Sequence, residues 1–172
     1  MSSRRLAYDL LHGVEVDGAY ANLLMPKLLA KAKLDSRDGA FAQELAFGAL
    51  RNSLRYNAII KICAGRETAE IDRDALLVLH IGAHQLLGMR VPTHAAISET
   101  VDLAKQVLRP SLTGFINGVL RRVSERDADE WLALITEGIS DRFELLAITH
   151  SHPRWIVAAL ADALRSDGRE AD

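Results

Sequence analysis

Residues 71–90, IDRDALLVLHIGAHQLLGMR, determine how the rest of the chain is arranged. Their apolar side chains are spread almost all round a helix of 3.6 residues per turn, instead of forming a single stripe. Such a helix needs other helices to cover it on every side, because any uncovered face would expose apolar surface to water. The stretch therefore predicts the central helix of the core.

Outward from this stretch, apolar residues recur at spacings of three and four, and alternation of period two is never sustained. Aromatic residues make up only 5% of the chain, whereas β-rich folds draw on aromatic and β-branched residues. The fold class predicted is all-α. Further helices are expected at about residues 3–16, 21–33, 36–52, 54–64, 93–109, 113–126 and 153–165.

Local signals mark some of the helix ends. Ser36 is predicted to cap the start of the helix expected at about residues 36–52. Gly65 is predicted to end the helix expected at about residues 54–64 in the manner of a C-cap. In residues 113–126, TGFINGVLRRVSER, the apolar positions are predicted to be buried. Gly114 and Gly118 are expected to let this helix approach a neighbour closely.

The chain has 172 residues, of which 49% are hydrophobic and 26% charged, as is ordinary for one globular core. No apolar run approaches the roughly 20 residues that a membrane-spanning helix needs, so no membrane partner is expected. Acidic residues interrupt the N-terminal segment where a signal peptide would be apolar. The single cysteine, Cys63, excludes an intramolecular disulfide, and a cytoplasmic location is expected.

Charge divides the chain in two. Residues 1–126 hold 17 Lys+Arg and 13 Asp+Glu, a net charge of +4, whereas residues 127–172 hold 4 and 10, a net charge of −6. The first part could meet a polyanion, and the second part by itself should not. We expect a domain over residues 1–126 and an acidic helical linker over residues 127–172.

Candidate catalytic and metal sites are weak. His80 and His84 stand four apart, a spacing that can direct two imidazoles to one metal, but no third ligand is evident and a structural role is favoured. Cys63 has no clear activating base and is expected to pack in the core. Glycine-rich phosphate loops are missing from the sequence. We assign no catalytic, cofactor-binding or metal residue, so a binding module is the leading class.

Arginines are the remaining candidates, because their planar fork suits phosphate oxygens. In the alternative interpretation, arginines near helix C-termini only complement the helix dipole and stay solvated. The residue types alone do not separate these two interpretations. The candidates for RNA contact are Arg4, Arg5, Arg51, Arg55, Arg121 and Arg122.

Four separated blocks carry a resemblance to a known family. They are DGAYANLLMPKLL, SRDGAFAQELAFGALR, LLVLHIGAHQLLGMRVPTHAAISETVDLAK and GFINGVLRRV, in this order. Together they resemble the N-terminal NusB-like domain of the RsmB (Sun, Fmu) family of 16S rRNA (cytosine-C5) methyltransferases. SHPRWIV, residues 151–157, is similar to the segment with which that family enters its catalytic half.

The resemblance implies a NusB-like antiparallel helical bundle that binds ribosomal RNA, followed by linker helices that lead to a methyltransferase domain. That domain would use S-adenosylmethionine and would carry a glycine-rich loop and a Pro-Cys motif, neither of which occurs in these 172 residues. We therefore expect the chain to be the N-terminal part of a longer enzyme, without enzyme activity by itself. Its partners would be ribosomal RNA and its own methyltransferase domain.

Two alternatives stay open. A stand-alone NusB-type transcription antitermination factor, which acts in the regulation of transcription, would share the helical fold and GFINGVL but would normally end soon after that helix. A protein-interaction module could instead use an apolar stripe of Trp155, Ile156 and Leu160 for docking. In a purely structural interpretation, these three side chains only complete the local core.

Overall fold

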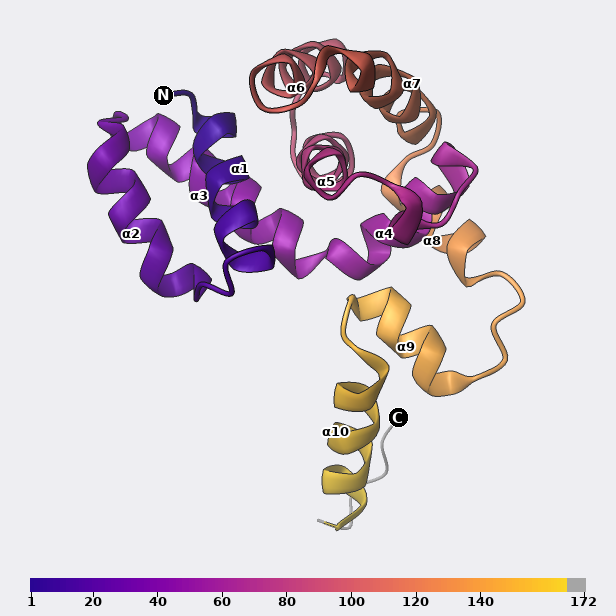
Figure 1. Cartoon of the computed structure of the whole chain (residues 1–172). Coiled ribbons are helices and arrows are strands. Elements are labelled where there is room, and N and C mark those ends of the chain that lie inside the picture. The colour runs from indigo at the N-terminus through magenta and orange to yellow at the C-terminus, as the bar shows by residue number, and fades with distance from the viewer. Residues whose placement is uncertain (167–172) are drawn as a thin grey trace.

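Helix α5 (Arg73–Leu87) passes through the middle of the molecule (Figure 1). In this computed structural model, five helices pack against it: α1, α3, α4, α6 and α7. Every residue from Leu77 to Gln85 is buried. The sequence prediction of a central core helix is confirmed.

The structure describes residues 1–166, and within them it contains ten α-helices, two short 3₁₀ helices and no strand. The prediction of an all-α fold is confirmed for this part of the chain. The helices before α5 are α1 (Ser3–Glu15), α2 (Ala21–Ala32), α3 (Ser36–Arg51), α4 (Ser53–Ala64) and η1 (Thr68–Glu70). Those after it are α6 (Thr93–Val107), η2 (Pro110–Leu112), α7 (Thr113–Val123), α8 (Ala128–Thr136), α9 (Arg142–His150) and α10 (Arg154–Ser166).

The ends of α3 and α4 position two of the predicted arginines. Asp35, and not Ser36, caps α3, because its side chain accepts a hydrogen bond from the backbone of Asp38. Only Asn52 separates α3 from α4, and its side chain donates back to the carbonyl of Gly48. The chain therefore turns within one residue. Gly65 ends α4 with a φ of 66°, as predicted for a glycine C-cap.

The close approach of α7 to its neighbour does not use the expected glycines. A Cβ atom added at Gly114 or Gly118 would meet no atom of residues 1–166 within 4 Å, so both positions face open space in the described structure. The glycine that matters is Gly82 on α5, where an added Cβ would lie 2.5 Å from Cδ2 of Leu120. The expectation for Gly114 and Gly118 was wrong because the close contact is made by a large residue of α7 against a small residue of α5.

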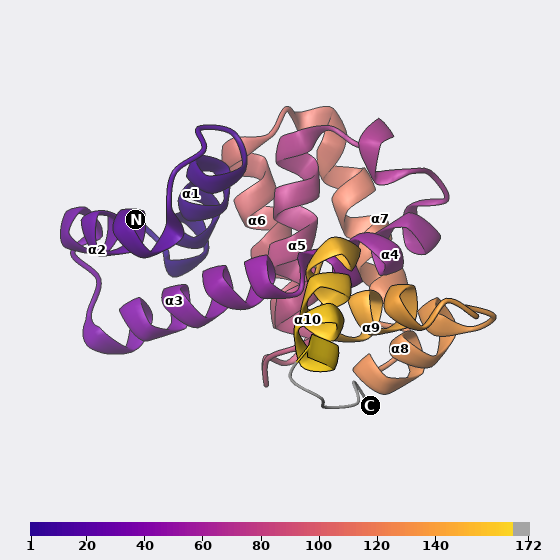
Figure 2. The same ribbon diagram turned by 90° about the horizontal axis from the view of Figure 1, so that it is seen from below.

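The acidic segment starts inside the bundle and ends outside it. Trp131 of α8 is 2% exposed and donates its indole N–H to the carbonyl of Val123, 2.8 Å away. Helix α9 contacts α4, whereas α10 packs mainly against α9 and extends away from the bundle (Figure 1). Seen from below, α1, α2 and α3 lie at the opposite end of the molecule from α8 and α9 (Figure 2). The boundary after residue 126 stays a prediction, and residues 167–172 of the second segment lie outside the described part.

Candidate nucleic-acid interface

The six predicted arginines lie on four helices and fall into three groups. Arg4 and Arg5 are on α1, Arg51 and Arg55 are on either side of the α3–α4 turn, and Arg121 and Arg122 end α7. Helices α1 and α7 lie on different sides of α5 (Figure 1). The fold brings the members of each group together, but it does not gather all six on one patch.

Arg4 takes part in a polar network inside the bundle. Its side chain is only 18% exposed, and its Nε donates to Oε1 of Gln85 at 2.7 Å. Gln85, which is fully buried, donates in turn to the hydroxyl of Thr100. Glu99 is 3.5 Å away, and burial lowers the pKa of Arg4 below its usual value. The network joins α1, α5 and α6, so Arg4 contributes to the packing of the bundle.

Arg5 is paired on its own helix. Its Nε donates to Oδ1 of Asp9 at 2.8 Å, and its guanidinium lies over the ring of Tyr8. The carboxylate offsets the charge of the arginine, which leaves less of it for a phosphate. Neither Arg4 nor Arg5 is tested by this geometry as an RNA contact, and both stay predictions.

The end of α7 has a different character. Nη1 of Arg122 donates to the carbonyl of Cys63 on α4, and Nε of Arg121 is 3.4 Å from Oδ1 of Asn117. Arg66 lies over the ring of Phe115, and Arg126 lies over the ring of Trp131. Arg66, Arg121, Arg122 and Arg126 are all exposed, and we call them the α7 basic end.

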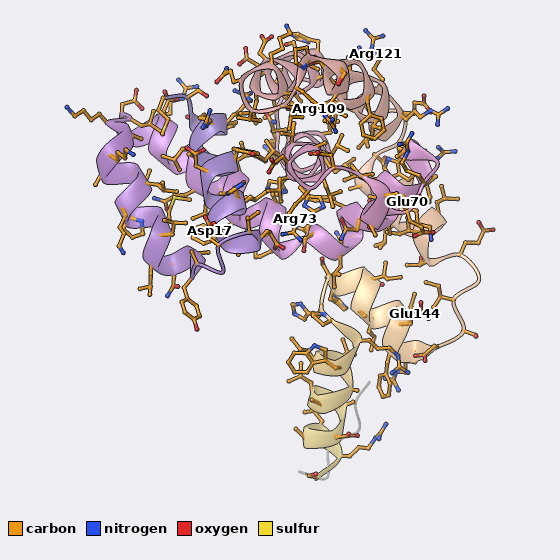
Figure 3. All side chains as sticks on the ribbon, in the orientation of Figure 1. Asp17, Glu70, Arg73, Arg109, Arg121 and Glu144 are labelled. Carbon is orange, nitrogen blue, oxygen red and sulfur yellow. The ribbon has the colours of Figure 1, made fainter. Side chains whose placement is uncertain are left out.

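None of these four arginines forms an ion pair with a carboxylate within residues 1–166. One carbonyl oxygen, one side-chain amide and two aromatic rings hold the guanidiniums in place without neutralising them. Arg121 points outward from α7 in Figure 3. Arg66 and Arg126 were not among the six predictions. The sequence signal for Arg126 is its place in the same stretch as Arg121 and Arg122, and the signal for Arg66 is that it follows the glycine that ends α4.

A groove between α6 and α7 lies beside this basic end. Its volume is about 780 Å³. Arg121 is one of the residues that line it, together with residues that carry hydroxyl, amide and imidazole groups. These include Thr93, His94, Ser98, Thr113, Asn117 and Ser124. Side chains of this kind donate hydrogen bonds to phosphate and sugar oxygens in nucleic-acid complexes.

Arg51 and Arg55 line one pocket where α3, α4 and α5 meet. Nη2 of Arg51 is 3.6 Å from Oε1 of Glu44. The Arg55 guanidinium donates to the carbonyl of Thr149, and its backbone N–H donates to the hydroxyl of Ser151. Arg55 therefore also fastens the end of α9 to α4.

The histidines and the cysteine that were weighed for chemistry are buried, and both histidines have protein partners. Nε2 of His80 is 2.7 Å from Oδ1 of Asn57, and burial lowers the pKa of His80 to about 4. Nδ1 of His84 is 2.7 Å from the hydroxyl of Tyr56. Burial raises the pKa of Cys63 to about 11, so the thiol is protonated at neutral pH. In the described part of the chain, no three potential metal ligands come together.

None of the helices within residues 1–166 has the length and hydropathy that crossing a bilayer would require.

Comparison with known proteins identifies the family. The model of the NusB family matches residues 1–125. A proposed methyltransferase from Mycobacterium tuberculosis is 42% identical over 163 residues, which cover 94% of this chain and 36% of that protein. The ribosomal RNA small subunit methyltransferase B of Escherichia coli is 33% identical over 160 residues, which cover 93% of this chain and 35% of that enzyme. The chain thus spans about a third of the length of these relatives.

A solved structure supports the fold. The solution structure of NusB from Aquifex aeolicus superposes with a TM-score of 0.61 and covers 81% of this chain and 92% of that one. Because only 20% of the aligned residues are identical, this likeness concerns the fold alone. The predicted NusB-like helical bundle and the resemblance read from four sequence blocks are both confirmed, and the chain belongs to the NusB family.

Proposed function

We propose that this chain is the RNA-binding domain of a longer 16S rRNA cytosine-C5 methyltransferase. In that enzyme it would hold ribosomal RNA while a separate catalytic domain transfers the methyl group from S-adenosylmethionine. The relatives named as methyltransferases, one of them for ribosomal RNA, support the substrate class. The observation that carries RNA binding is the α7 basic end, where four exposed arginines have no carboxylate partner in residues 1–166.

The α7 basic end fits a phosphate backbone for electrostatic reasons. A phosphate that approaches Arg5 or Arg51 competes with Asp9 or Glu44 for the guanidinium, whereas one that approaches Arg121 meets no such competitor. The α6–α7 groove adds uncharged donors beside it. Contacts of this kind position the RNA and supply affinity, and the choice of base would rest with the catalytic domain and RNA shape.

Charge reversal tests this surface. We expect Arg121→Glu/Arg122→Glu to weaken binding of a 16S rRNA fragment. The slope of the logarithm of the binding constant against the logarithm of the salt concentration should become less steep by about 0.7–0.9 for each phosphate that the protein no longer neutralises. Fluorescence anisotropy at several salt concentrations measures both. The matched control is Arg37→Glu/Arg73→Glu, which changes the net charge equally at the starts of α3 and α5.

Folding of both double variants is checked by circular dichroism and thermal unfolding. Arg121→Glu alone is the safeguard, because Arg122 also bonds to Cys63 and its replacement could loosen α7. If the α7 variants bind the rRNA fragment as tightly as the control does, with the same salt slope, RNA does not use this surface.

We also propose that α10 docks onto the methyltransferase domain of the same longer enzyme. Trp155 is 71% exposed and Leu160 is also exposed, whereas Ile156 is half-buried. The interpretation that all three complete the local core therefore does not hold for Trp155 and Leu160. The length of the relatives beyond the matched third supports a further domain as the occupant of this face.

Trp155→Ser/Leu160→Ser in the longer enzyme tests the docking. We expect rRNA methylation to fall while rRNA binding is retained, because the RNA-binding domain would no longer be held against the catalytic domain. Unchanged methylation would contradict the proposal. A stand-alone antitermination role stays an alternative. It would be favoured if the longer protein restored transcription antitermination in a system that lacks a NusB-type factor but transferred no methyl group to rRNA.

A further inference from the structure

Buried hydrogen-bond donors without partners in the described structure line the pocket at the α3–α4 turn. Its volume is about 220 Å³, and the residues around it come from α3, α4, α5 and the start of α8. Two of them, His84 and Arg55, carry a buried nitrogen, Nε2 and Nε respectively, that has no hydrogen-bond partner within residues 1–166. Buried donors in folded proteins are nearly always paired, so two orphans in one pocket call for a physical explanation.

The imidazole of His84 is held in one orientation. The residue is 3% exposed, and the Tyr56 hydroxyl bonds to Nδ1 at 2.7 Å. A Cβ atom added at Gly88 would lie 2.5 Å from Cε1, and one added at Gly48 would collide with Nε2. Two glycines therefore form the slot that the ring fills, and a larger residue at either position would displace it.

The hydrogen bond to Tyr56 determines which ring nitrogen carries the proton. Burial raises the pKa of the Tyr56 phenol, so the phenol stays protonated and donates to Nδ1. Burial also lowers the pKa of His84, so the ring is neutral at pH 7. In this tautomer Nε2 carries a hydrogen. Oε1 of Glu44 lies 3.6 Å from Nε2, which is too long for a hydrogen bond, and its charge offsets only part of the effect of burial on the pKa of the ring.

Arg55 and Arg51 add positive charge to the same pocket. Arg55 is anchored through its bond to Thr149, which fixes the guanidinium, and its buried Nε finds no acceptor in the part of the chain that the structure describes. Arg51 is 3.6 Å from the same Glu44 oxygen that faces His84. Glu44 thus stands between two donors without bonding closely to either, and its side chain is 54% exposed and free to turn outward.

We propose that this pocket binds an oxyanion of the phosphate class. The anion would accept hydrogen bonds from Nε2–H of His84, Nε–H of Arg55 and the guanidinium of Arg51, and it would displace Glu44 towards solvent. A water molecule could accept from two of these donors but would bring no charge to offset the two arginines. The anion is either free phosphate or a phosphate of RNA. The site is separate from the α7 basic end and does not depend on RNA binding there.

Isothermal titration calorimetry with sodium phosphate, against sodium chloride at equal ionic strength, tests the proposal on the whole chain. We expect saturable binding of phosphate that weakens on the order of tenfold in Arg51→Gln, which removes a charge-assisted donor. Glu44→Gln should bind phosphate several-fold more tightly, because it removes the competing carboxylate. Glu99→Gln is the matched control, since Glu99 also pairs with an arginine, Arg4, but lies outside the pocket.

Arg51 and Glu44 are exposed, so both variants are expected to fold, and thermal unfolding checks this. The absence of saturable phosphate binding overturns the proposal, and so does equal affinity in wild type, Arg51→Gln and Glu44→Gln. The source of the anion is separated in the Arg121→Glu/Arg122→Glu background. There, displacement of bound phosphate by a short single-stranded RNA identifies an RNA phosphate, and undisturbed binding identifies free phosphate. Both outcomes support the site, and neither depends on the α7 basic end.

Discussion

Trp131 and Trp155 belong to the same acidic segment but have opposite environments. Trp131 on α8 is 2% exposed, bonds to the Val123 carbonyl and lies under the guanidinium of Arg126. Trp155 on α10 is 71% exposed. The contrast shows that α8 is part of the bundle core although its charge resembles that of the rest of the segment. Net charge therefore describes the surface of a segment and does not say whether the segment is packed.

Replacing each tryptophan by alanine tests this contrast and should give the largest effect. Trp131→Ala removes a buried indole and should lower the free energy of unfolding by about 3–5 kcal/mol. Trp155→Ala should change it by no more than about 0.5 kcal/mol, because the side chain has little packing to lose. Urea denaturation followed by circular dichroism measures both. Similar decreases in the two variants would mean that α10 is packed as firmly as α8.

The burial of His80 should make the stability of the protein depend on pH. Burial lowers the folded-state pKa of His80 to about 4, below its ordinary value of 6.5. As pH falls through 6.5 the unfolded chain takes up a proton that the folded chain refuses, so stability present above pH 6.5 is lost down to about pH 4. The expected decrease is about 3 kcal/mol. Urea midpoints between pH 4 and 7 measure it.

His80→Gln should remove the part of this decrease that His80 causes, while its amide can still donate to Asn57. The part caused by His84, whose pKa burial also lowers, should remain. His150→Gln, the same replacement at the exposed end of α9, is the control for the substitution itself. An equally steep fall of stability in His80→Gln would show that other groups cause the decrease.

Replacing Gly82, inside the α5–α7 contact, or Gly118, outside it, by alanine should change the stability in opposite directions. Gly82→Ala places a methyl group within 2.5–3.2 Å of three atoms of the fully buried Leu120 side chain and should destabilise by about 1–2 kcal/mol. Gly118→Ala adds a methyl group in open space on α7 and should stabilise by about 0.5–1 kcal/mol. Thermal unfolding compares the two. A decrease of stability in Gly118→Ala would indicate a contact that the structure does not contain.

Sequence reasoning succeeded where a property depends on residues within a few turns. The position of α5 and the glycine cap at Gly65 follow from local spacing and from the conformational freedom of glycine. It failed for Gly114 and Gly118, because a glycine in a helix does not reveal which face meets a neighbour. Arg4 was predicted to contact RNA, and the sequence could not reveal its hydrogen bond to Gln85, because the two residues are 81 positions apart in the chain.

By itself, the sequence determined the helical class, the central helix and the family, because apolar periodicity and ordered motif blocks are properties of the linear chain. Only the tertiary structure decided which arginines keep an unpaired charge, since Arg122 meets Cys63 and Arg66 meets Phe115 across helix contacts. It also decided that His84 and Arg55 share a pocket. The physical reason is that hydrogen bonding and charge pairing depend on distances in space, which periodicity along the chain does not specify.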